Sequence, residues 1–97
     1  MAHTVNQLAM LKVDLGLMAL TEDQKAYLGQ QLDAAQSRLT RQGITLVAGD
    51  PDHDELVVMY ASWLYRKRTG EGSTEMPQPL RTARNDLLFS QKARASE

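Results

Sequence analysis

The chain contains no cysteine, which excludes disulfide bonds and metal sites built from thiolates. It also lacks an apolar run near the roughly 18 residues that a membrane span requires. Residues 1–16 lack the basic segment that opens a signal peptide. We therefore expect no membrane contact and no secretory signal, and the absence of cysteine suits a reducing compartment.

A strong charge of one sign is also missing. The chain has 11 Lys and Arg residues against 12 Asp and Glu residues, for a net charge of −1. Residues 1–65 hold eight acidic and four basic residues, whereas residues 66–97 hold seven basic and four acidic residues. A dedicated nucleic-acid-binding domain is usually strongly basic. This balance argues against one, but it is compatible with a ring whose subunits meet DNA only collectively.

Length and composition predict one domain that spans residues 1–97. The chain is 42% hydrophobic and 24% charged, which is ordinary for a folded globular protein. A domain of this size buries roughly 60–70% of the surface that its unfolded chain exposes. That burial is sufficient for a single core.

The most informative segment comprises residues 50–70, which read as a helix that is apolar nearly all the way round. Ser62 is the only polar residue among the ten from Leu56 to Tyr65. Trp63 lies within the widest apolar arc. A helix without a polar face must be buried on most sides, so the pattern predicts a central helix covered by other helices or by other subunits.

Local end signals define this helix and the one before it. Asp50 and Pro51 fit an N-cap followed by proline at the first helical position, and Gly70 fits the end of the helix. Residues 21–24 (TEDQ) form a capping-box pattern, and Gly43 ends the helix that it opens. The apolar stripe of that helix comprises Leu28, Leu32, Ala35 and Leu39.

Two shorter helices are expected near the ends of the chain, at about residues 4–13 and 79–93. The inner stripe of the last helix is Leu80, Ala83 and Leu87, with three- and four-residue spacing. The sequence therefore predicts an all-α fold, a small bundle of about four helices with a central apolar third helix. The C-terminal helix and tail, residues 79–97, are expected to reorganise on assembly.

The connections between these helices carry further expectations. Residues 44–47 are β-branched and too short for a sheet of their own, so we interpret them as an extended connector that is available to pair with another chain. Residues 70–78 are rich in glycine and polar residues, which favours a mobile loop. The tail, residues 95–97, is expected to fray.

Tests for metal binding and catalysis give no positive signal. Residues 50–55 (DPDHDE) resemble the opening of a calcium loop, but the sixth position is Glu55 instead of glycine and the twelfth is Ala61 instead of an acid. His3 and His53 lack a second ligand four residues on, and we expect both to be solvated. No phosphate-binding loop or nucleophile set is recognisable, so no catalytic, cofactor-binding or metal-binding residue is predicted.

Two surface groups are candidates for partner contact. Arg66, Lys67 and Arg68 could meet DNA phosphates, although cations are also favoured at a helix C-terminus for local reasons, and that interpretation is preferred. Phe89 is expected to point away from the inner stripe of the last helix. Aromatic residues favour interface cores, and single exposed aromatics are also common. The candidate partner or portal surface is Arg81, Leu88, Phe89 and Lys92.

The order of these patterns resembles a known family. The runs LKVDLGLMALTEDQKAYLGQQLDAAQSRL, DPDHDELVVMYASWLYRKR and MPQPLRTARNDLLFSQ are similar to the small head–tail connector (adaptor) family of tailed bacteriophages, which includes putative DNA-packaging proteins. The likeness covers residues 11 to about 91. It lies in the succession of a short helix, a capped amphipathic helix, a Pro/Asp-rich turn, an apolar helix with a basic end, a loop and a final helix.

This resemblance implies a structural protein and not an enzyme. Family members form rings, typically dodecameric, below the portal protein after DNA packaging, and they support a downstream tail-connector or stopper protein. DNA passes through such a ring without specific contacts. The resemblance also implies location in the virion, and in the host cytoplasm during assembly. The segment that engages the portal corresponds to residues 80–92.

The alternative function is a small helical DNA-binding regulatory protein. Short helices and a basic helix end permit it. Against it, no basic recognition helix with base-reading side chains follows a tight helix-turn-helix corner.

Overall fold

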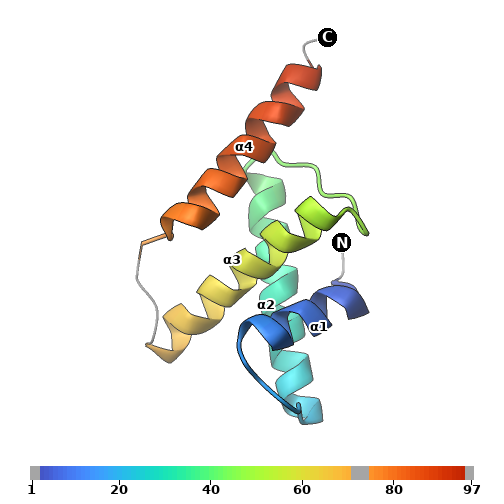
Figure 1. The fold of residues 1–97 in the computed structure, drawn as a ribbon, viewed down its shortest axis with the longest axis vertical. Helices are drawn as coiled ribbons and strands as arrows, with labels where there is room; N and C mark the ends of the chain where they lie inside the picture. Colours follow the sequence, from blue (N-terminus) through green and yellow to red (C-terminus); the bar gives the residue numbers. More distant parts are fainter. Residues whose placement is uncertain (1–2, 71–74, 96–97) are drawn as a thin grey trace.

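The computed structural model describes residues 3–70 and 75–95, and over these residues the fold is all-α without strands (Figure 1). The helices are α1 (Val5–Asp14), α2 (Glu22–Arg41), α3 (Pro51–Thr69) and α4 (Gln78–Ala95). The predicted bundle of four helices is confirmed. Residues 71–74 of the predicted mobile loop lie outside the described residues, as do residues 96–97 of the tail.

Side-chain caps fix the helix starts where the sequence places them. The Thr21 hydroxyl accepts a hydrogen bond from the Gln24 backbone N–H at 3.1 Å, and the Gln24 amide oxygen accepts from the Thr21 backbone N–H at 2.9 Å. Thr4 and Gln7 form the same reciprocal box at the start of α1. Such a cap typically contributes about 1 kcal/mol, so these helix boundaries are determined locally.

The bounds of α3 are equally local. The Asp50 side chain accepts from the backbone N–H groups of Asp52 and His53, and Pro51 occupies the first turn. Gly70 ends the helix in the left-handed conformation, with φ of 79°. Glycine adopts this conformation without the steric cost that a side chain brings.

Helix α3 is the centre of the bundle, as predicted. It packs against α1, α2 and α4, and Figure 1 shows α1 and α4 flanking it with α2 behind. Nine of its residues are buried. Its core partners on the other helices include Leu11, Leu28, Leu32, Leu39 and Leu80. A helix with apolar residues on most sides therefore finds cover on most sides within one chain.

Trp63 differs from its predicted place in the middle of the core. Its neighbours Tyr60 and Leu64 are buried, but Trp63 is only partly buried. Its ring meets Tyr60 edge-on with centroids 5.6 Å apart, and the Lys67 ammonium lies 5.2 Å from the Trp63 centroid. The three covering helices leave this margin of α3 partly open, and the Lys67 stem covers part of the indole.

We expect Trp63→Ala to lower the free energy of unfolding by about 2 kcal/mol, below the roughly 3–5 kcal/mol typical of a fully buried aromatic. Urea denaturation followed by circular dichroism measures this change. Met18→Ala is the control, because Met18 is 93% exposed and surface changes usually stay within about 0.5 kcal/mol. If the Trp63→Ala variant is already unfolded without urea, Trp63 contributes as much as a fully buried core residue.

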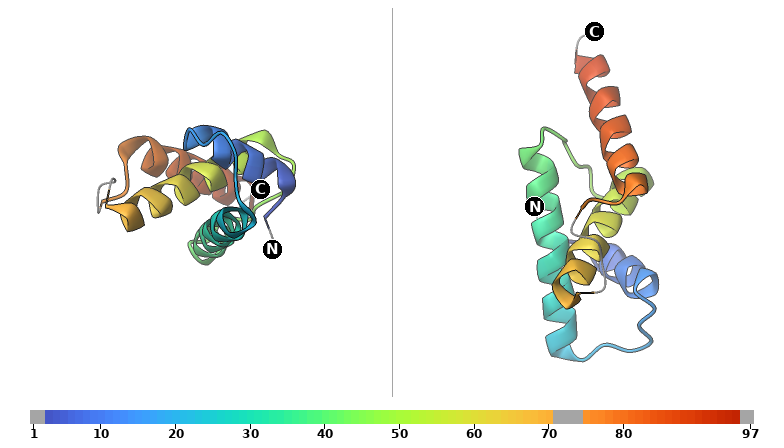
Figure 2. Two further views of the ribbon diagram at one scale, coloured as in Figure 1. Left: turned by 90° about the horizontal axis from the view of Figure 1, so that it is seen from below. Right: turned by 90° about the vertical axis from the view of Figure 1, so that its left-hand side faces the viewer.

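Helix α4 attaches to the bundle by one side. Among the helices it packs on α3 alone. Leu80 is its only fully buried apolar side chain among the described residues, while Ala83 and Leu87 are partly buried against the core, which confirms the predicted inner stripe. Figures 1 and 2 show its C-terminal half extending beyond the other helices. The protein is accordingly elongated, with principal extents of 47 × 27 × 19 Å.

The connector between α2 and α3 is extended, as predicted, but it is not an open edge. Ile44 and Leu46 are buried in the core. The Gln91 side chain of α4 brackets Thr45: its amide oxygen accepts from the Thr45 N–H at 2.8 Å, and its amide nitrogen donates to the Thr45 carbonyl at 2.7 Å. Pairing with another chain at Thr45 would have to displace this contact.

Candidate protein-interaction surface

Phe89 is the centre of the candidate surface. It lies in the projecting half of α4 and is 75% exposed. Because each helical residue advances by 100°, Phe89 points about 200° away from Leu87, which faces α3. The prediction that Phe89 faces away from the inner stripe is confirmed. Every other aromatic side chain among the described residues is buried or partly buried.

Arg81 and Lys92 are exposed on the same helix, as expected. The Arg81 guanidinium donates to the Met76 carbonyl at 3.2 Å, which ties the segment before α4 to its first turn. Together with Phe89, these two residues form what we call the α4 surface. It combines one aromatic ring with two cationic side chains.

Leu88 does not belong to this surface. It is partly buried and packs against the core. A Cβ atom added at Gly43 would lie 3.6 Å from Leu88 Cδ1, so Leu88 covers the end of α2 where Gly43 has no side chain. The expectation that Leu88 faces outward beside Phe89 is therefore wrong. The two side chains differ by 100° around the helix, which is enough to direct Leu88 toward the core and Phe89 toward solvent.

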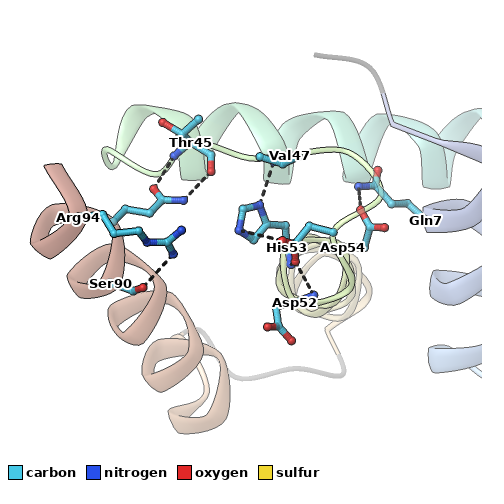
Figure 3. Close-up of polar contacts among 10 residues, drawn as sticks. Gln7, Thr45, Val47, Asp52, His53, Asp54, Ser90 and Arg94 are labelled. Carbon is cyan, nitrogen blue, oxygen red and sulfur yellow. Dashed lines mark hydrogen bonds and ion pairs between the residues drawn. The ribbon is translucent and has the colours of Figure 1, made fainter.

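Further polar contacts hold α4. The Gln91–Thr45 pair has the shortest distances, and in the first half of α4 Arg84 donates to the Gln42 side chain at 3.4 Å. Arg94 donates to the Ser90 hydroxyl at 3.0 Å within the helix (Figure 3). The Gln91–Thr45 and Arg84–Gln42 contacts tie α4 to the connector and to the end of α2. No local pattern predicts these two contacts, because each joins residues more than 40 positions apart.

The basic end of α3 is exposed. The Arg66 guanidinium donates to the Asp14 carbonyl at 3.2 Å, joining α3 to the end of α1. Lys67 covers the Trp63 ring. Arg68 is exposed at the last turn. Two of these three cations thus have intramolecular contacts besides their favourable place at a helix C-terminus, while DNA contact by Arg66, Lys67 and Arg68 stays a prediction.

The two histidines are not the solvated side chains that were expected. His53 is buried, its Nδ1 accepts from the Val47 backbone N–H at 2.9 Å, and its Nε2 lies 3.9 Å from an Asp50 oxygen (Figure 3). His3 is partly buried and contacts Asp33 at 2.9 Å through Nδ1. The sequence does not show that the connector passes over the first turn of α3, and this passage buries His53.

A buried polar network joins α1, α2 and α3. The Gln36 amide donates to the Gln7 side-chain oxygen at 2.9 Å, and the Gln7 amide donates to the Asp54 carboxylate at 2.9 Å. Figure 3 shows the hydrogen bond between Gln7 and Asp54 in this network. All three side chains are buried. Buried polar groups of this kind restrict how helices pack, because any other register leaves them unpaired.

Within residues 3–70 and 75–95, no group of three or more His, Asp or Glu side chains is arranged to hold a metal ion. No helix in the same ranges combines the length and apolarity of a membrane span.

Comparisons with known proteins add no relative. No family model matches the chain, and no match was found among curated proteins or solved structures. The assignment of function accordingly rests on the sequence resemblance and on the arrangement of α4.

Proposed function

We propose that this chain is a structural subunit of the head–tail connector of a tailed bacteriophage. It assembles as a ring below the portal after DNA packaging and catalyses no reaction. The single observation that carries the proposal is the projecting half of α4, which presents an exposed Phe89 and is attached to the bundle by one side only.

A ring subunit needs a rigid body and a segment that reaches a partner. Here α1, α2 and α3 form the body, with one continuous core, and α4 extends from it (Figure 2). Contacts between two different surfaces of identical subunits close into a ring when the rotation per subunit fits. The dodecameric number, the portal above, the stopper below and the DNA in the channel come from the family resemblance.

The energetics favour α4 as the segment that docks. Burial of the exposed Phe89 side chain by a partner would stabilise the complex. One buried aromatic anchor contributes about 2 kcal/mol or more to the binding free energy of an interface. A ring repeats each contact once per subunit, and linked contacts reinforce one another through effective concentration. A modest loss at Phe89 therefore becomes a large loss in the assembled connector.

We expect Phe89→Ser to retain the helicity and melting temperature of the native chain while losing most of its assembly onto the portal. The measurement combines circular dichroism of the isolated variant with sedimentation of the variant mixed with portal rings. Met18→Ser is the matched control, because it also removes an exposed apolar side chain, but from the connection between α1 and α2 instead of from α4.

Two results would count against this role of Phe89. A variant that melts much earlier would place the ring in the core of the fold. Normal co-sedimentation with portal, equal to that of Met18→Ser, would place the docking surface elsewhere.

A further inference from the structure

An open groove runs between α1 and α3, with a volume of about 530 Å³. Its apolar lining is Ala9, Met10, Val13, Val58 and Met59, and the carboxylates of Asp14 and Glu55 complete it. Val13 is 78% exposed, and Met10 and Met59 are only partly buried. We call this feature the α1/α3 groove. No described part of the chain covers it.

We propose that the α1/α3 groove receives Phe89 from a second copy of this chain. Phe89 is the one aromatic side chain that the described fold leaves exposed, and the groove is apolar and open. Two methionines line it, and methionine adapts its shape to a partner and packs favourably against aromatic rings. This inference rests on the proposed function, because it names the partner that α4 contacts in the ring.

Charge complementarity supports the same pairing. Helix α4 carries four basic residues and one acidic residue. The groove presents Asp14 and Glu55. No ion pair within the described residues engages Glu55. A basic helix approaching this side of α3 thus meets opposite charge, which steers association and fixes orientation.

A single copy cannot fill its own groove. Helix α4 packs on α3 and does not pack on α1, and the two flank α3 in Figure 1. The buried Leu80 fixes the face that α4 turns to α3, which leaves Phe89 directed away from the bundle. The Phe89 side chain and the groove therefore lie on different surfaces of one chain. In the assembly, each of these two surfaces contacts a different neighbouring copy, which is the heterologous contact that a ring-shaped oligomer requires.

Two variants test the two sides of this contact separately. Phe89→Ser removes the aromatic side chain that we propose inserts into the groove. Val13→Arg fills the groove with a cation that repels the basic α4, at an exposed position near the C-terminus of α1, where a cation is tolerated. Because Phe89 and Val13 are both mostly exposed, circular dichroism should show both variants folded. Each should raise the dissociation constant of self-association about 30-fold or more.

Mixing the two variants gives the decisive result, measured by sedimentation velocity over a range of concentrations without portal. The native chain should form assemblies larger than a dimer, and each variant alone should stay monomeric. An equimolar mixture should form a one-to-one heterodimer that does not grow, since only the intact Phe89 of Val13→Arg and the intact groove of Phe89→Ser can pair. Met18→Ser should assemble like the native chain.

A mixture that stays monomeric, or a Phe89→Ser variant that self-associates normally, would overturn the inference. If Phe89→Ser self-associates normally but no longer binds portal, the proposed function stands, and Phe89 of a second copy is not the occupant of the groove. If the native chain neither self-associates nor binds portal, both proposals fail.

Discussion

Replacing Leu11 with alanine should lower the free energy of unfolding by about 3–4 kcal/mol, within the range for truncating a buried leucine. Leu11 is 0% exposed, and it is one of only two buried residues of α1. The remainder of α1 contributes partly buried side chains such as Leu8 and Met10. The cavity left by Leu11→Ala would therefore loosen the whole of α1 from the bundle.

Urea denaturation of Leu11→Ala measures this loss. Val13→Ala is the matched control on the same helix, because its side chain is 78% exposed, and it should change stability by less than about 0.5 kcal/mol. A domain with a total stability of about 5–15 kcal/mol has little margin for the larger loss. Equal effects of the two substitutions would show that α1 is not held by Leu11.

Gln7→Leu should cost about 3 kcal/mol, although it replaces a polar residue with an apolar one at a buried site. Gln7 donates to Asp54 and accepts from Gln36, both at 2.9 Å. Its side-chain oxygen also accepts from the Thr4 backbone N–H at 3.1 Å. Leucine leaves the Asp54 carboxylate and the Gln36 amide buried without this partner, and the desolvation of those groups is then uncompensated.

The control for Gln7→Leu is Gln30→Leu, an exposed glutamine on α2, which should change stability by less than about 0.5 kcal/mol. The triple replacement of Gln7, Gln36 and Asp54 by apolar residues should recover part of the loss, because the buried Gln36 amide and Asp54 carboxylate are then removed together with their partner. If Gln7→Leu is as stable as the native chain, the network does not contribute to the packing of α1.

The helices could be predicted because their signals are local. The Thr21 capping box, the Asp50 cap and Gly70 each act within four residues of a helix end, and the structure uses all three. The central place of α3 followed from its composition, since a helix with one polar residue in ten has no face for solvent. Phe89 was placed outside by the 100° step from Leu87, and this too needs only one helix.

The errors have a common physical origin in contacts between distant parts of the chain. His53 is buried because residues 44–49 pass over it, and Val47 donates to its ring. The Gln7–Asp54 bond spans 47 positions. Leu88 lies near the margin of its helix, so its burial depends on the space beside Gly43. No periodicity within one helix encodes such relations.

Only one half of the proposed docking contact could be predicted from the sequence. The exposed side of α4 follows from helical geometry, and Arg81, Phe89 and Lys92 lie there. The α1/α3 groove combines residues near position 10 with residues near position 58, and only the packing angle of the two helices creates it. A pattern along the chain therefore identifies the exposed Phe89 but not the groove that we propose receives it.

We propose that this chain is a ring-forming connector subunit that joins a portal. Sedimentation of the native chain with and without purified portal rings, followed by native mass spectrometry of the sedimenting species, tests it most directly. We expect a fixed number of copies bound per portal ring, with Met18→Ser equal to the native chain and Phe89→Ser largely lost from the complex. A chain that stays monomeric with portal and instead binds duplex DNA with sequence preference would contradict it and favour a DNA-binding regulator.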